Sequence, residues 1–208
     1  MTHWFTSDLH LGHENVALMH RGARSVEQHD QAIVENLLRC LQSGDDLYIL
    51  GDLSLGRKRD IDHAVTLLTP VARRVGYKHM HLIRGNHDPK AKWATQRLAE
   101  VFSTITDTMV LQVADMPPLI LSHYPSTQVA NTVARTGVPA GCSSNAFDPK
   151  VLYGNSLTRA ETHILLYGHT HDQTPTRSEW GCFDVNVGVD AWAYKPVSLN
   201  HIRAHTNL

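Results

Sequence analysis

The chain has 208 residues, a length that predicts one domain over residues 1–208 whose core needs no disulfide bonds. Its hydrophobic share of 42% and charged share of 19% are ordinary for a globular protein and exclude a disordered chain. The net charge is −1 and no apolar run approaches the roughly 20 residues that span a bilayer, so the sequence indicates neither a nucleic-acid polymer nor a membrane as partner.

Five short apolar runs are each followed at once by a cluster of turn-forming and polar residues. Short runs bounded in this way are typical of buried strands. In chain order they occupy residues 3–7, 47–50, 79–84, 119–122 and 164–167, and they lead into DLHLGH, GDLSLG, GNHD, HYP and GHTH.

The sequence between these runs predicts helices. Residues 26–41 carry apolar side chains at helical spacing, residues 61–68 form a second helix that ends before Pro70, and residues 90–102 form a third. The tail at residues 180–202 has strand-like pieces, CFDVNVGV and PVSLNHI, that can complete a second sheet. Strands alternating with helices predict a layered α/β fold.

One segment, residues 126–153, matches neither period and is rich in Gly, Pro, Ser, Thr and Asn. It is longer than most loops in compact domains, and long loops of this kind often bind ligands. We interpret it as a specificity loop or insertion.

The polar clusters all begin where a predicted strand ends. Ligands bind at the carboxyl ends of strands in open α/β sheets, so we expect these side chains to gather at one edge. They are carboxylates, imidazoles and an amide, without a thiolate, and such a set suits divalent manganese, iron or zinc. Its members are Asp8, His10, Asp52, Asn86, His87, His123, His169 and His171.

The order of these blocks, D-x-H, G-D, G-N-H-D, a single His and G-H-T-H, resembles the signature of the calcineurin-like metallophosphoesterases. The opening D-L-H-L-G-H resembles that of small bacterial and phage phosphodiesterases. Any one block alone is more often a turn or a chance match, whereas five in order, each after an apolar strand, indicate the family.

The resemblance implies a four-layer α/β/β/α sandwich with a dinuclear metal site at the carboxyl edge of the strands. Two divalent ions, manganese first, with iron, zinc, nickel or magnesium as alternatives, would lie roughly 3.5–4 Å apart and activate a bridging hydroxide. The implied ligands are Asp8, His10 and His171 for the first ion, Asn86, His123 and His169 for the second, and Asp52 as the bridge.

Other residues receive their roles from their place beside these ligands. The resemblance implies that His87 protonates the leaving oxygen as a general acid. Asp88 precedes a Pro and is expected to cap the next helix. We expect substrate contacts from His13, Arg84 and Tyr124, packing from Trp192 and Tyr194, and solvated surface positions for His20, His29, His63, His201 and His205.

The second block departs from that of the protein phosphatases of the superfamily, G-D-x-x-D-R-G. Leu55 stands at its acidic position and Gly56 at its arginine position. These departures favour a phosphodiesterase acting on small, nucleotide-type substrates. The alternatives are a phosphomonoesterase, a DNA-end nuclease, which the low net charge disfavours, and a catalytically silent metal-binding scaffold for protein partners, which predicts missing ligands.

The three cysteines, Cys40, Cys142 and Cys182, form no C-x-x-C pair, and an odd number of scattered cysteines favours free thiols. The first residues lack a charged lead followed by an apolar core, so no signal peptide is expected. Both observations favour the cytoplasm.

Overall fold

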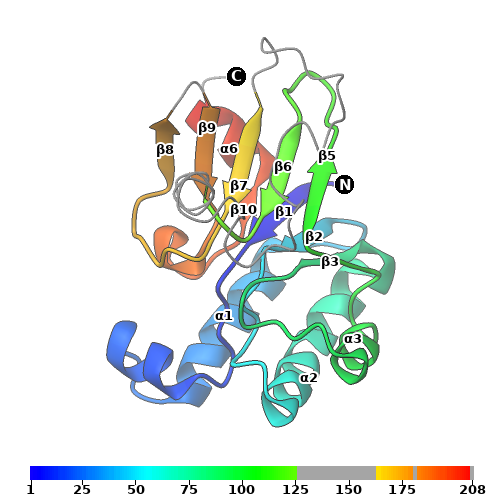
Figure 1. Ribbon diagram of the computed structural model, residues 1–208, viewed down its shortest axis with the longest axis vertical. Coiled ribbons are helices and arrows are strands. Elements are labelled where there is room, and N and C mark those ends of the chain that lie inside the picture. Colours follow the sequence, from blue (N-terminus) through cyan, green and yellow to red (C-terminus); the bar gives the residue numbers. More distant parts are fainter. Residues whose placement is uncertain (126–162, 180–181, 207–208) are drawn as a thin grey trace, which may run out of the picture.

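Two sheets packed face to face form the centre of the fold, with helices around them (Figure 1). The computed structural model describes residues 1–125, 163–179 and 182–206, so the segment at 126–153 lies outside the described residues. Within these ranges each sheet has five strands. No helix among the described residues is both long and apolar enough to cross a membrane.

The first sheet has the order β10-β1-β2-β3-β4. Its four neighbouring strands β1 to β4 run parallel, and β10 pairs with β1 antiparallel at the edge. The strands are β1 (His3–Thr6), β2 (Asp46–Ile49), β3 (Met80–Ile83), β4 (Thr104–Thr106) and β10 (Val197–Ser198).

The second sheet has the order β5-β6-β7-β9-β8. The three inner strands β6, β7 and β9 are parallel, and antiparallel strands close both edges. The strands are β5 (Thr108–Leu111), β6 (Leu119–Ser122), β7 (Ile164–Tyr167), β8 (Thr176–Glu179) and β9 (Cys182–Asn186).

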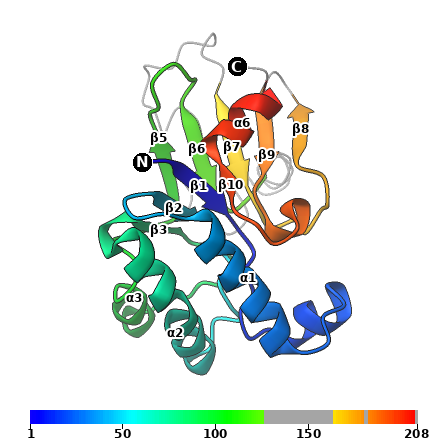
Figure 2. The same cartoon turned by 180° about the vertical axis from the view of Figure 1, so that it is seen from behind.

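Helices α1, α2 and α3 lie together against the outer face of the first sheet (Figure 1). Figure 2 shows α6 on the same side of the molecule as α1, and its side chains join the core between the sheets. The helices are α1 (Val26–Cys40), α2 (Lys58–Val75), α3 (Lys92–Leu98) and α6 (Leu199–Thr206), with the shorter turns η1 (Asn15–His20), η2 (Tyr77–His79) and η4 (Val189–Trp192).

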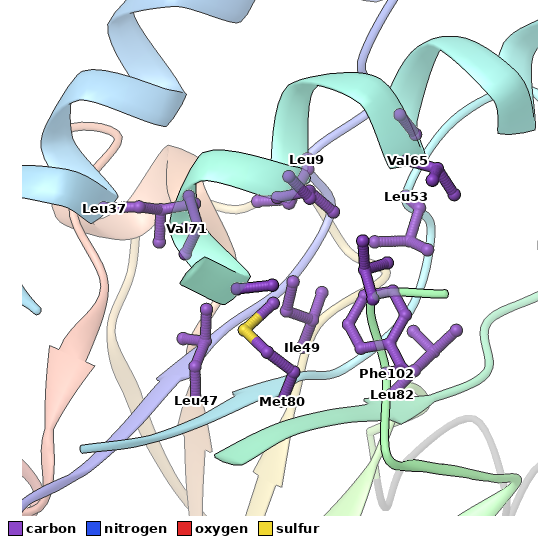
Figure 3. Close-up of a cluster of buried hydrophobic side chains, with 14 of the residues drawn as sticks. Leu9, Leu37, Leu47, Ile49, Leu53, Val65, Val71, Met80, Leu82 and Phe102 are labelled. Atoms are coloured by element: carbon purple, nitrogen blue, oxygen red, sulfur yellow. The ribbon is translucent and has the colours of Figure 1, made fainter. Parts of the chain in front are cut away.

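Two apolar cores hold these layers together. In the first, Leu37 of α1 and Val71 of α2 pack above Leu47 and Met80 of the sheet (Figure 3). The second fills the space between the sheets with residues such as Phe5, Leu50, Leu121 and Leu166. Each large apolar side chain buried in this way contributes about 1.5–3 kcal/mol, so the docking of the sheets is driven by apolar burial.

The structure confirms the predicted α/β sandwich, the five predicted strands and the helix at 26–41. Among the described residues, no helix covers the outer face of the second sheet, where Ile120, Leu165 and Tyr167 cluster, so these residues do not include the fourth layer of the prediction. The third predicted helix is shorter than expected, and PVSLNHI is a two-residue strand followed by α6.

The prediction that the second helix ends before Pro70 is wrong, because α2 continues through Pro70 to Val75. A proline inside a helix removes one hydrogen bond and costs about 3 kcal/mol. Pro70 faces solvent, while Val71, Ala72 and Val75 beyond it are buried in the first core. Burial of these side chains offsets the loss, so tertiary packing overrides local propensity.

The helical cost of Pro70 remains in the folded protein. Replacing Pro70 with Ala should raise the free energy of unfolding by about 1–3 kcal/mol, since Ala is the better helix former by about 3 kcal/mol and the more flexible unfolded chain offsets part of this gain. Thermal and urea unfolding measure the change, with Thr66→Ala on the same exposed face as the control. Unchanged or lower stability of Pro70→Ala would contradict this account.

Candidate metal centre

The carboxyl ends of strands from both sheets meet at one place. The arrowheads of β1, β6 and β7 converge there (Figure 1), and backbone hydrogen bonds join the loops that follow. Asp8 N–H donates to the carbonyl of Gly51 at 3.0 Å, and Gly168 N–H donates to the carbonyl of His123 at 3.1 Å. A Cβ atom on Gly168 would overlap the side chains of Ser7 and Asp8, so only glycine permits this approach between the sheets.

The first cluster of donor atoms consists of Asp8, His10 and His171, whose ligand atoms all lie within 4.8 Å of one another. The Nε2 atoms of His10 and His171 are 3.2 Å apart, and His171 Nε2 is 4.0 Å from Asp8 Oδ1. Asp8 and His10 are buried, whereas His171 is partly open to solvent.

The second cluster consists of Asp52, His123 and His169, again within 4.8 Å. His123 Nε2 lies 3.1 Å from His169 Nδ1 and 3.0 Å from the amide oxygen of Asn86. The structure thus brings together all seven residues predicted as ligands, while their binding of metal stays a prediction.

Asp52 lies between the two clusters. Its Oδ2 is 3.7 Å from His10 Nε2, and its Oδ1 is 3.5 Å from His123 Nε2. Each oxygen of one carboxylate therefore faces a different cluster. Donor atoms that share one cation at 2.0–2.2 Å lie roughly 3–3.6 Å apart, and the distances in both clusters are close to this range.

The protonation pattern of the imidazoles also fits a cation. His123 Nδ1 lies 2.8 Å from the carbonyl oxygen of Leu50, which can only accept, so Nδ1 carries a hydrogen and the lone pair of the neutral ring is on Nε2. That lone pair faces the amide oxygen of Asn86, another acceptor. Two acceptors at 3.0 Å need a proton or a metal ion between them, and nitrogen and oxygen donors of this kind suit divalent ions.

The pKa shifts in the site show which group balances the negative charge of its carboxylates when no metal ion is bound. Burial alone would lower the pKa of His123, but its hydrogen bond with Asp52 and the charges of Asp8 and Asp52 raise it to about 9. Burial would raise the pKa of Asp52, yet His123 and the N–H of His87 hold it well below its usual range. A proton on His123 thus stabilises the buried Asp52 carboxylate.

Five of the seven predicted ligands have left-handed backbone conformations, which sequence analysis did not anticipate. Positive φ angles are uncommon outside glycine, though Asp and His adopt them more readily than most residues. Such angles tend to concentrate at functional sites, where the surrounding structure enforces them. The five are Asp8 (φ 59°), His10 (47°), Asp52 (54°), His169 (72°) and His171 (53°).

Asp88 is not the helix cap that we expected, since α3 begins at Lys92 with Ala91 as its N-cap. It is 4% exposed, and its carboxylate accepts hydrogen bonds from the backbone N–H groups of Asp52 and Gly85, both at 2.8 Å, and of Leu53 at 3.2 Å. A local D-P-K pattern cannot reveal partners 35 residues away. Asp88 fixes the backbone that carries Asp52, the predicted bridge.

His87 lies at the edge of the site rather than in a cluster. Its backbone N–H donates to Asp52 Oδ1 at 3.0 Å, while its imidazole, 37% exposed, places Nε2 at 3.9 Å from Asp52 Oδ2. The ring lies edge-on to that of His10, with centroids 5.5 Å apart. An accessible imidazole beside the clusters can exchange a proton with a bound substrate.

The three residues predicted to contact substrate have different surroundings. The His13 ring lies 5.3 Å from that of His10 and 6.3 Å from that of His87. Tyr124 packs against His123 and His169, with ring centroids 5.0 and 5.1 Å away.

Arg84, in contrast, is bound by residues outside both clusters. Its guanidinium donates to Asp107 at 3.4 Å and to Thr95 at 3.3 Å.

Among the residues expected at the surface, His29 is buried at 3% exposure, so that expectation is wrong for it. His29 contacts Arg21, which in turn binds Asp190, and Asp190 lies 2.9 Å from His171 Nδ1. Sequence reasoning missed both residues. Arg21 follows no predicted strand, and Asp190 directly follows the strand-like piece CFDVNVGV but belongs to none of the five blocks.

Comparison with known proteins agrees with this geometry. The family description "Calcineurin-like phosphoesterase superfamily domain" matches residues 1–198. The chain belongs to this superfamily. It is thus placed among metal-dependent phosphoester hydrolases, a class consistent with the two clusters of candidate metal ligands.

Similar proteins occur in two mycobacteriophages. The Gene 66 protein of Mycobacterium phage D29 is 29% identical over 215 residues, covering 98% of this chain and 95% of that protein. The Gene 66 protein of Mycobacterium phage L5 is 28% identical over 203 residues, covering 91% of this chain and 86% of that protein.

Two solved structures resemble the fold. A protein of unknown function from Aquifex aeolicus superposes with a TM-score of 0.64 at 23% identity, covering 98% of both chains. A phosphopantetheinyl hydrolase from Mycobacterium tuberculosis superposes with a TM-score of 0.46 at 16% identity, covering 90% of this chain and 89% of that one.

The role found for Asp88 predicts the effect of replacing its carboxylate with an amide. Asp88→Asn leaves one acceptor oxygen and turns an NH₂ group toward backbone donors, so we expect a loss of about 1–3 kcal/mol in the free energy of unfolding. Because the backbone of Asp52 then shifts, Mn²⁺ affinity should fall as well. Urea unfolding and Mn²⁺ titration measure the two effects, and the control is Asp62→Asn, whose side chain is 46% exposed and pairs with Arg97. Normal stability and affinity in Asp88→Asn would refute the role.

Proposed function

We propose that this superfamily member is a phosphodiesterase that hydrolyses small, nucleotide-type diesters with the help of two divalent metal ions, manganese being the first to test. The observation that carries the proposal is the position of Asp52, whose two oxygens face different clusters at 3.7 and 3.5 Å. Ions held there would neutralise phosphate charge and lower the pKa of a coordinated water.

The preference for diesters rests on the second block of the sequence. A Cβ atom at Gly56 would overlap the carbonyl oxygen of His87, and the φ of Gly56 is +82°, so no arginine fits at this position. The arginines that follow it are already paired, since Arg57 donates to Asp60 at 2.7 Å and Arg59 at 3.4 Å. Both side chains are at least half exposed.

The other arginines near these loops are engaged as well. Arg84 binds Asp107 and Thr95, and Arg21 is buried against Asp190. A phosphate monoester is a dianion and gains most from additional cationic partners, each worth about 1.5–3 kcal/mol. A diester carries a single negative charge that two metal ions can satisfy, so the paired arginines favour a diester substrate.

Two side chains suit the leaving group of such a substrate. His87, accessible and next to Asp52, can donate a proton to the departing oxygen. Tyr124, beside the second cluster, offers an aromatic ring to a planar group such as a nucleobase.

The substrate class is tested by comparing bis-p-nitrophenyl phosphate with p-nitrophenyl phosphate in the presence of Mn²⁺. After division by the uncatalysed rates, we expect kcat/KM to be higher for the diester by roughly ten- to a hundredfold, the rate equivalent of one missing ionic partner. Asp52→Asn is the control, because loss of the bridging charge should abolish both activities. A corrected preference for the monoester would contradict the proposal and favour a phosphatase.

The role of His87 predicts a dependence on the leaving group. His87→Gln should slow the hydrolysis of alkyl esters by roughly 10²–10⁴-fold, the usual contribution of general acid catalysis, and that of nitrophenyl esters much less, because nitrophenolate needs little protonation. Metal content should not change, and metal analysis of the purified variant checks this. Equal losses on both kinds of ester would instead indicate that His87 positions the substrate.

A further inference from the structure

Arg21 is a buried cation that none of the roles above requires. It follows η1 directly, and its side chain is 2% exposed. The guanidinium forms a two-pronged ion pair with Asp190, from Nε to Oδ1 at 2.8 Å and from Nη2 to Oδ2 at 2.7 Å. Such paired hydrogen bonds fix the relative orientation of both side chains.

Asp190, in η4, connects this pair to the first cluster. Its Oδ2 lies 2.9 Å from His171 Nδ1, and the carboxylate can only accept, so Nδ1 of His171 carries the hydrogen. The lone pair of His171 is then on Nε2, the atom that faces His10 at 3.2 Å. A carboxylate bound to the far nitrogen of a histidine fixes the ring and makes it a better metal ligand.

Arg21 also holds the main chain of the first cluster. Nη2 donates to the carbonyl of Asp8 at 2.7 Å, and Nη1 donates to that of Leu9 at 3.3 Å. Asp8 has the left-handed φ of 59°, so these bonds support a backbone conformation that the chain would otherwise avoid. One guanidinium therefore stabilises two parts of the same cluster.

A second chain of contacts locks Arg21 in place. Nη1 of Arg21 lies 2.9 Å from His29 Nε2, and His29 Nδ1 lies 2.8 Å from Asp30. Asp30 accepts from the backbone N–H of Gly12, in the loop that carries His10. The contacts described for Arg21 and Asp190 include none to Asn86, His123 or His169 of the second cluster.

We propose that Arg21 and Asp190 are positioning residues that set the affinity of the first metal site and leave the second largely unaffected. This inference rests on the proposed function only in taking the two clusters as metal sites. It concerns the ring of His171 and the backbone of Asp8, and neither Arg21 nor Asp190 contacts substrate in it.

The test is Mn²⁺ binding to the metal-free full chain, followed by isothermal titration and by electron paramagnetic resonance. The native protein should bind two ions, and the paired ions give a coupled spectrum. Asp190→Asn and Arg21→Lys should weaken one binding step by roughly 10–100-fold, the usual effect of disturbing the partner of a metal-binding histidine. When one equivalent of Mn²⁺ has been added and only the unweakened site is filled, the spectrum of each variant should be that of a single isolated ion.

Arg97→Gln is the matched control, because Arg97 pairs with Asp62 and Glu100, which belong to neither cluster, and its loss should leave both binding steps unchanged. Thermal unfolding of each variant shows whether it folds. If Arg21→Lys does not fold, Asp190→Asn alone tests the inference. Equal weakening of both steps, or none, would overturn the inference. If the native protein binds two ions but cleaves no phosphate ester, the proposed function is refuted. The binding data then still decide the inference about Arg21 and Asp190.

Discussion

Three carboxylates, those of Asp8, Asp52 and Asp88, lie almost without solvent exposure where the two sheets meet. Burying a charge is costly unless partners compensate for it, and the loops around the site are arranged to supply those partners. Asp88 is satisfied by three backbone N–H groups, and both oxygens of Asp8 accept from the N–H of His169. Asp52 receives one backbone N–H and otherwise faces imidazoles, so its charge is available to cations.

Both sheets contribute residues to the site around these carboxylates. The first sheet supplies the carboxylates and His10, whereas the second supplies His123, His169 and His171. Neither sheet alone carries a complete cluster, because Asp8 needs His171 and Asp52 needs His123. The site can therefore form only when the apolar core between the sheets is closed, which couples the chemistry of the edge to the packing beneath it.

The parts of the molecule that could be predicted are those encoded within a few consecutive residues. Each ligand block follows an apolar run, so the strands and the grouping of Asp8, Asp52 and His123 could be read from the sequence. The rest depends on contacts between distant segments. Pro70 stays helical because of burial beyond it, Asp88 binds backbone 35 residues away, and Arg21 meets Asp190 across 169 residues, a separation that no local pattern records.

The left-handed backbone at five predicted ligand positions restricts how this site can change over evolution. Aspartate and histidine are useful at these positions as metal-binding side chains, and they are also among the non-glycine residues that best tolerate positive φ. A β-branched replacement would be doubly unfavourable, since it removes the donor atom and strains the main chain. Asparagine and glycine are the replacements that this backbone tolerates best. A descendant that no longer bound metal should therefore carry them at positions 8, 10, 52, 169 and 171.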